Sequence, residues 1–174
     1  MECTVSQQNQ TRAKRLETLR SAMAAAGFDG WSIGREDMYQ GEEVPAGDER
    51  LAYLSGFTGS AGFAVVLGDR AGLFSDGRYS LQMPAQTNSA AWDCNTIPDV
   101  TCEDWLKTAG LANGAIIAID GRLVTVAGFR RFEESVLAAG GTLVCHHENL
   151  LDQQWHDRPA LPPAASWRMP IENA

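Results

Sequence analysis

Apolar residues recur at helical spacing in two long segments of the chain. Leu16, Leu19, Met23 and Ala26 are separated by three or four positions, with charged residues between them. This spacing places the four side chains on one face of a helix, and Gly27 is a typical residue at which a helix ends. A second amphipathic helix, ended by two glycines, is predicted from Val126, Phe129, Phe132, Val136 and Leu137.

Short runs of apolar residues between these helices predict buried strands. The runs are Trp31–Ile33, Phe63–Leu67, Ala71–Ser75, Trp92–Ile97, Ile116–Ile119 and Leu143–Cys145. Only a tight turn, Gly68-Asp69-Arg70, separates the second run from the third, which predicts an antiparallel hairpin. The alternation of strands and helices favours an α/β fold with three layers (α/β/α) and a mixed, roughly six-stranded sheet.

Shorter helices are predicted from local signals. One covers Asp48–Leu54 and is stopped by Gly56, and another lies near Tyr79–Gln86, although Pro84 is unfavourable inside a helix. Thr101–Asp104 resembles a capping box in front of a further helix.

The polarity of the two ends predicts the domain organisation. Residues 1–10 are polar and are expected to form a disordered tail. Residues 11–152 then form one α/β domain of ordinary size. Residues 153–174 contain four prolines and are expected to be an interdomain linker or the start of a next domain.

Composition excludes several classes of protein. The 174 residues carry a net charge of −8 and no dense cluster of Lys and Arg, so nucleic-acid binding is not expected. No apolar stretch is long enough to span a membrane, and Met1–Gln10 lacks the apolar core of a signal peptide. We therefore expect a cytoplasmic protein whose four cysteines are reduced.

The usual catalytic and cofactor motifs do not fit this chain. Gly56, Gly59 and Gly62 match neither a dinucleotide-binding loop nor a P-loop, and they precede a strand, so a tight loop is expected. Ser60 is not in a G-x-S-x-G context, and nothing in the sequence supports a catalytic triad around it. The adjacent His146 and His147 should point to opposite faces of a strand, so no metal site is expected within this chain.

Asp76-Gly77-Arg78-Tyr79 is the most distinctive short segment. It joins a tight turn to an arginine, which binds carboxylates in a planar, bidentate manner, and to an aromatic ring. Two interpretations stay open at this point. Arg78 either contributes to a binding cleft or forms a structural ion pair with a residue such as Asp48 or Glu49.

Two blocks together resemble a known family. Asp48–Gly62 (DERLAYLSGFTGSAG) and Asp76–Gln82 (DGRYSLQ) are similar in order and separation to the N-terminal domain of the aminopeptidase P (Xaa-Pro aminopeptidase) family, the creatinase/prolidase N-terminal domain. The sequence around Glu148–Asp152 and Trp155 agrees, so the likeness runs from about residue 12 to residue 163. The chain departs from the family at Tyr39, where a histidine is common, and at Glu43, where an aromatic is common.

The resemblance implies a division of labour. In that family a separate C-terminal domain holds two divalent metal ions (Mn, Co or Zn) and removes N-terminal residues before proline. This chain is then a non-catalytic domain that supports dimer formation and substrate access, with the catalytic domain of the same polypeptide and a proline-containing peptide as its partners. The positions that the resemblance places at the substrate entrance or an interface are Arg78, Tyr79, Phe57 and Arg50.

Two other hypotheses are kept beside this one. In the first alternative, the chain is a stand-alone binding or interaction module that kept the fold without peptidase activity. In the second, it is a hydrolase that uses Ser60 as its nucleophile. If a partner domain covers part of this one, exposed aromatic residues should mark the contact face. The candidates for such residues are Trp155 and Trp167.

Overall fold

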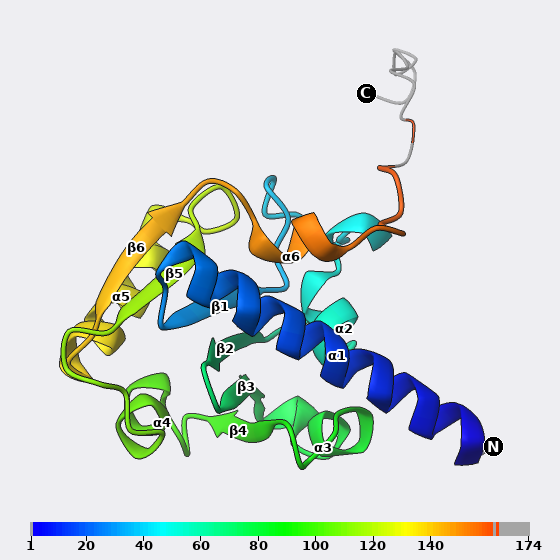
Figure 1. Cartoon of the computed structure of the whole chain (residues 1–174), viewed down its shortest axis with the longest axis horizontal. Coiled ribbons are helices and arrows are strands. Elements are labelled where there is room, and N and C mark those ends of the chain that lie inside the picture. The colour runs from blue at the N-terminus through cyan, green and yellow to red at the C-terminus, as the bar shows by residue number, and fades with distance from the viewer. Residues whose placement is uncertain (1, 162, 164–174) are drawn as a thin grey trace, which may run out of the picture.

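The computed structural model of the chain describes residues 2–161 and residue 163, with the side chains of residues 7–161 and 163. A six-stranded sheet with the order β4-β3-β2-β1-β5-β6 lies between two layers of helices (Figure 1). Its strands are β1 (Gly30–Gly34), β2 (Phe63–Leu67), β3 (Ala71–Asp76), β4 (Asp93–Ile97), β5 (Ile116–Asp120) and β6 (Thr142–His146). The expected α/β architecture with a mixed sheet is confirmed.

The direction of the strands brings most loops to one edge of the sheet. β2 pairs antiparallel with both β1 and β3, while the other pairs are parallel, so β2 alone runs against the rest. The predicted hairpin is the β2–β3 pair, closed by a hydrogen bond from Leu67 N–H to the Arg70 carbonyl at 2.8 Å. We call the edge where β1, β3, β4, β5 and β6 end, and where β2 begins, the carboxyl edge.

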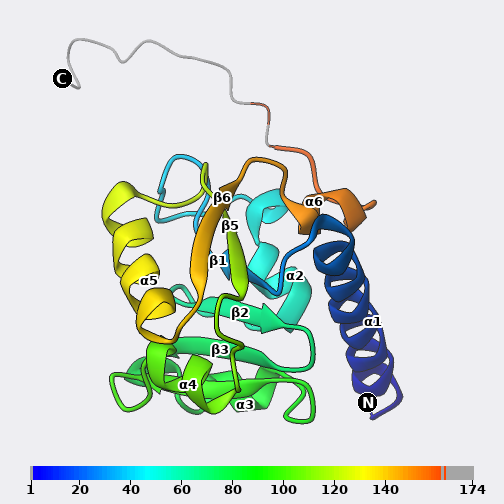
Figure 2. The ribbon, with the colours of Figure 1, turned by 60° about the vertical axis from the view of Figure 1, so that its left-hand side comes forward.

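Helices cover both faces of the sheet (Figure 2). One face packs against α1 (Glu2–Ala26), α2 (Arg50–Ser55), α3 (Gln82–Gln86) and α6 (Leu150–Gln154), and the other against α4 (Cys102–Thr108) and α5 (Val126–Ala138). Single 3₁₀ turns, η1 (Ala46–Asp48) and η2 (Gly77–Tyr79), precede α2 and α3. The side chains of β1 alternate between these faces, because Trp31 and Ile33 belong to the core under α1 whereas Ser32 faces the other side.

The helical spacing seen in the sequence identifies the buried face of α1. Leu16, Leu19 and Met23 are almost fully buried, as predicted, whereas Ala26, which was predicted on the same face, is exposed at the end of the helix. The helix, however, begins at Glu2 and therefore includes the described backbone of residues 2–10, which we expected to be a disordered tail. The physical reason is that no glycine or proline interrupts the sequence before Gly27, so an established helix extends upstream.

Pro84 sits where a proline is tolerated. The segment predicted as one helix near Tyr79–Gln86 is divided into η2 and α3, and α3 begins at Gln82. Pro84 is then the third residue of α3, in the first turn, where backbone N–H groups have no partner within the helix. The predicted N-cap is also confirmed, because Thr101 Oγ1 accepts a hydrogen bond from Asp104 N–H at 3.1 Å, while the Asp104 carboxylate accepts one from the Thr101 hydroxyl at 2.6 Å.

Candidate functional site at the carboxyl edge

The glycine-rich loop before β2 is shaped by close approach rather than by ligand chemistry. Gly56 ends α2 with φ +91°, a conformation that side chains other than glycine rarely adopt. A Cβ atom on Gly59 would collide with the ring of Phe57, and one on Gly62 would lie 2.9 Å from the Phe74 carbonyl oxygen. The expectation of a tight loop with close backbone packing is therefore confirmed.

Three of the four predicted entrance residues meet at this loop. The ring of Phe57 is buried and packs edge-on against Tyr79, with ring centroids 5.5 Å apart. The Tyr79 hydroxyl lies 2.7 Å from Ser60 Oγ, and the hydrogen bonds with Ser60 lower the pKa of Tyr79. The guanidinium of Arg78 lies over the Tyr79 ring at 5.2 Å. Loop, aromatic pair and arginine thus form one cluster.

Arg78 pairs with the aspartate of its own turn. Its Nε and Nη2 donate to Asp76 Oδ1 and Oδ2 at 2.9 and 2.8 Å, and its side chain is 67% exposed. An ion pair was one of the two interpretations kept open for Arg78, but the partners suggested for it, Asp48 and Glu49, were wrong. Asp48 instead pairs with Arg50 and Arg158, and Glu49 with Arg35, because those arginines lie closer in the fold.

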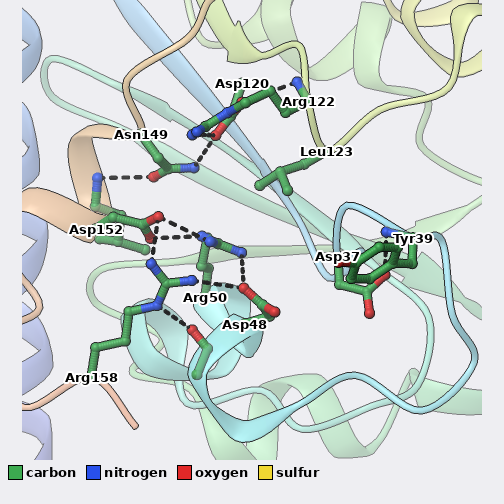
Figure 3. Close-up of polar contacts among 12 residues, drawn as sticks. Asp37, Tyr39, Asp48, Arg50, Asp120, Arg122, Leu123, Asn149, Asp152 and Arg158 are labelled. Atoms are coloured by element: carbon green, nitrogen blue, oxygen red, sulfur yellow. Dashed lines mark hydrogen bonds and ion pairs between the residues drawn. The ribbon is translucent and has the colours of Figure 1, made fainter. Parts of the chain in front are cut away.

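Arg50, the fourth predicted residue, lies apart from this cluster in a buried ion-pair network (Figure 3). It donates to Asp152 Oδ1 and Oδ2 at 2.7 and 2.9 Å and lies 3.0 Å from Asp48 Oδ1. Burial lowers the pKa of Arg50, but its hydrogen bonds and charge interactions with Asp152 and Asp48 outweigh burial, so its pKa is raised overall. Arg158 completes the network, with 2.7 Å to Asp48 and 2.8 Å to Asp152.

The Asp48–Arg50–Asp152–Arg158 network ties the end of the domain to the start of α2. Arg158 Nε also donates to the Gly47 carbonyl at 2.6 Å. The segment after residue 152, which we expected to be an interdomain linker or the start of a next domain, is therefore held against the domain as far as Arg158. Two arginines facing two aspartates leave no net charge in this partly buried network, and loss of one member would leave a charge without its partner.

Trp155 is part of this same attachment. The Trp155 ring stacks on the Tyr53 ring, with centroids 4.1 Å apart. The guanidinium of Arg15 lies 3.7 Å from the centroid of the Tyr53 ring. Trp155 is only 9% exposed, so the prediction that it marks an exposed contact face was wrong. The stack explains its burial, because α1, α2 and the segment after α6 all contribute a side chain to it. Trp167 lies outside the described residues.

Sequence reasoning missed a second Asp-Gly-Arg turn at the end of β5. Arg122 donates to Asp120 Oδ1 and Oδ2 at 3.0 and 2.8 Å, and Asn149 donates to Asp120 Oδ2 at 3.1 Å (Figure 3). Burial raises the pKa of Asp120, but the hydrogen bonds from Arg122 and Asn149 outweigh it and lower that pKa overall. The signal was available, since the same three residue types follow two of the predicted strands.

The loop after β1 is held in place by an aspartate. The buried Asp37 accepts hydrogen bonds from Tyr39 N–H and Gly41 N–H at 2.9 and 3.0 Å. Gln40, with φ +56°, donates to the carbonyls of Asp37 and Leu123 and so links this loop to the loop after β5. As a result, Tyr39 is presented at the carboxyl edge with 77% of its surface exposed.

The geometry of the described residues supports neither a metal site nor an activated serine nucleophile. No group of three or more His, Cys, Asp or Glu among them is placed to hold a metal ion. The ring of His146 packs edge-on against Phe28 and Trp31. Within the described part of the chain, Ser60 Oγ bonds to Tyr79, and no histidine is hydrogen-bonded to it. Nor does any described helix have the length and apolarity to cross a membrane.

Comparison with known proteins finds relatives over most of this chain. The chain is 38% identical over 168 residues to a "Probable Xaa-Pro aminopeptidase P" of Arthroderma otae, covering 92% of this chain and 26% of the relative. A protein of the same description from Chaetomium globosum is 40% identical over 152 residues, covering 84% and 24%. The chain thus spans about a quarter of these relatives.

Solved structures give the same result. The X-prolyl aminopeptidase of Caenorhabditis elegans, described as a cytosolic enzyme with a di-nuclear active site, superposes with a TM-score of 0.77 and 32% identity, over 87% of this chain and 27% of that one. The N-terminal domain of the cytoplasmic peptidase PepQ of Mycobacterium tuberculosis superposes with a TM-score of 0.61 and 25% identity, over 80% and 97%. Residues 15–154 match the family model described as Creatinase/Prolidase N-terminal domain, and the chain belongs to this family.

Proposed function

We propose that this chain is the non-catalytic N-terminal domain of an Xaa-Pro aminopeptidase-like metallopeptidase. Its role is to support oligomerisation, with a homodimer as the expected assembly, and access of the peptide substrate to a catalytic domain of the same polypeptide. The observation that carries the proposal is Arg78, an exposed cation fixed in its turn beside Tyr79 and the loop 56–62. The relatives named above, about four times as long, support it.

The exposed donors of Arg78 define what this domain can contribute. Asp76 engages Nε and Nη2, so Nη1 remains available for a carbonyl or carboxylate of a peptide. The Phe57–Tyr79 pair holds the backbone beneath the arginine. Arg50 acts differently, as an anchor that fixes the segment leaving the domain through Asp152. In this proposal Arg78 and Tyr79 face substrate and Arg50 is a positioning residue.

The chemistry of bond cleavage belongs to the rest of the proposed polypeptide. Two divalent metal ions (Mn, Co or Zn) in the catalytic domain would activate water for hydrolysis of the bond before proline. The di-nuclear site named for the C. elegans enzyme supports this assignment, and its cytosolic description supports a cytoplasmic location. The described residues of this chain offer no ligand set for such ions.

The first test is hydrolysis of an Xaa-Pro peptide by the purified 174-residue chain with added Mn²⁺, Co²⁺ or Zn²⁺. We expect no turnover above a mock purification from the same host. Metal-dependent turnover that co-purifies with the chain would overturn the non-catalytic assignment. A reading frame that continues beyond Ala174 into a metal-ligand domain is the second expected result, whereas a frame that stops there would favour the stand-alone binding module.

The role of Arg78 is tested in the full-length gene product. Arg78→Met should lower kcat/KM for Xaa-Pro peptides about tenfold, the loss typical of one charged contact to substrate. Arg122→Met is the matched control, because Arg122 lies at the same edge in the same kind of turn. Equal losses in the two variants would contradict a substrate-facing role for Arg78. Sedimentation velocity of the same protein tests the homodimer.

A further inference from the structure

A cavity of about 580 Å³ lies at the carboxyl edge on the side of the sheet that α4 and α5 cover. Ser32, Phe63 and Ile119 form its sheet wall, and α5 closes it with residues around Phe132. Of the described helices, α4 and α5 alone cover this face, and the space between them and the ends of β1 and β5 stays open. Its volume falls within the range of small-molecule pockets, and the ends of parallel strands are a frequent place for them.

The surface of this cavity is more apolar than polar. Six of its lining residues are aliphatic or aromatic and belong to the elements on this side of the sheet or to the loops at its edge: Phe63, Ile97, Ile119, Leu123, Val124 and Phe132. The thiol of Cys102 also lines it, and burial raises the pKa of Cys102 to about 12, so the thiol stays neutral. Ser32 Oγ makes no hydrogen bond with the described residues, so a polar atom of a ligand has a partner there.

Among the charged residues that line the cavity, Glu36 and Arg131 have no ion-pair partner in the described part of the chain. Four charged residues line it: Glu36, Arg50, Asp120 and Arg131. Asp48 and Asp152 neutralise Arg50, and Arg122 neutralises Asp120. Within the described part of the chain, neither Glu36 nor Arg131 forms an ion pair, and both are exposed. The two come from different walls, the loop after β1 and helix α5.

We propose that this cavity is a binding site for a short zwitterionic peptide with apolar side chains. The apolar walls accommodate the side chains, Arg131 binds the terminal carboxylate, and Glu36 binds the terminal ammonium group. An apolar peptide satisfies both unpaired charges and removes apolar surface from water, whereas a simple anion would leave Glu36 without a partner. The site goes beyond the proposed function, because binding here requires no catalytic domain.

The probe is the dipeptide L-leucyl-L-phenylalanine, titrated into the 174-residue chain by calorimetry and by ¹H–¹⁵N NMR. We expect saturable binding, with amide shifts concentrated in β1, β5 and the first turns of α5. The N-acetylated dipeptide lacks the ammonium group, and the C-terminal amide lacks the carboxylate. Each should bind about two- to fivefold more weakly, as expected for one solvent-exposed ion pair. Absence of saturable shifts at the cavity would overturn the proposal.

Neighbouring residues provide matched controls for the variants. Arg131→Met should weaken binding of the free dipeptide about two- to fivefold but leave binding of its amide unchanged, while Arg130→Met, one position along α5, should change neither. Glu36→Gln should weaken binding of the free dipeptide but leave binding of the N-acetylated dipeptide unchanged. Glu43→Gln is its control and should change the affinity for neither peptide. If Arg130→Met weakens binding as much as Arg131→Met, the affinity depends on the overall charge of the chain. The assignment of Arg131 to the terminal carboxylate would then be wrong.

A variant that fills the cavity tests the apolar part of the site. Ser32→Leu places a larger side chain against Phe63 and Ile119, and it should abolish the NMR shifts while the chain stays folded by circular dichroism. Ser135→Trp, on the more exposed wall of α5, provides the same test with little risk to the core. Unchanged affinity in a folded form of either variant would place the dipeptide elsewhere and overturn the proposal.

Discussion

The two Asp-Gly-Arg turns, at the ends of β3 and β5, have the same local structure in different surroundings. In the first, Arg78 binds Asp76 through Nε, Nη2 and its backbone N–H at 2.9, 2.8 and 3.0 Å. In the second, Arg122 binds Asp120 through the same three groups at 3.0, 2.8 and 3.1 Å. Three consecutive residues after a strand are therefore enough to specify this turn and its ion pair.

Burial separates the two turns. The Asp76 side chain is 42% exposed, whereas that of Asp120 is 2% exposed and also bonded to Asn149 at the start of α6. A Cβ atom on Gly77 would meet open space, but one on Gly121 would lie 3.0 Å from Cys145 Sγ. Exposed ion pairs contribute little to stability, and buried ones are costly to break. The β5 turn thus holds the fold together, and the β3 turn leaves its arginine available for a ligand.

The largest expected difference in the free energy of unfolding is between variants of the two aspartates. Asp120→Ala should lower the free energy of unfolding by about 2–3 kcal/mol, because it leaves the buried Asn149 amide and Arg122 without their acceptor. Asp76→Ala, in the exposed turn, should give no measurable change. Urea denaturation of both variants at pH 7 measures this. Similar losses in the two variants would mean that burial does not distinguish the turns.

The pH dependence of stability should follow the same division. The pKa of Asp120 is lower in the folded chain than in the unfolded one, so its contribution is complete above about pH 4, the unfolded value, and is lost as the pH falls through the folded value. The stability gap between wild type and Asp120→Ala should therefore narrow on going from pH 7 to pH 3. A stability difference between wild type and Asp120→Ala that grows toward acid pH would show that folding raises the pKa of Asp120 instead of lowering it.

Replacement of the two arginines should give a smaller difference in stability. Arg122→Met should cost about 1 kcal/mol, because the half-exposed guanidinium is partly screened by water while the carboxylate that it leaves is buried. Arg78→Met should leave thermal unfolding unchanged, so that any loss of peptide turnover in the full-length protein reflects lost contact with substrate. A clear drop in Tm for Arg78→Met would instead indicate a structural role for this residue.

Replacement of the two glycines should give the smallest difference in stability. Gly121→Ala should lower stability by about 0.5–1 kcal/mol, since the new methyl group must displace the Cys145 side chain. Gly77→Ala meets no neighbouring atom, and it should leave stability unchanged or raise it slightly through the unfolded state. Paired thermal melts resolve the difference. Equal effects would show that Cys145 moves aside without cost.

The elements that were predicted well are those whose signals are local. The hairpin β2–β3 was predicted from its apolar strands and short turn, and α4 from the Thr101 cap. Phe57 and Tyr79 were named in advance and are in contact. Arg50 was named as well, but it lies in the Asp48–Arg50–Asp152–Arg158 network, because its partners are distant in sequence and become its neighbours only when α6 packs beside α2.

The sequence by itself determined the layered α/β architecture, the glycine-rich loop and the shape of each Asp-Gly-Arg turn. These features depend on hydrophobic periodicity and on the conformations that a few neighbouring residues allow. Only the tertiary structure decided that Trp155 is buried against Tyr53, that Asp120 meets Asn149 and that a cavity remains beside α5. The reason is that burial and charge pairing depend on residues far apart in the chain, and folding alone brings those residues together.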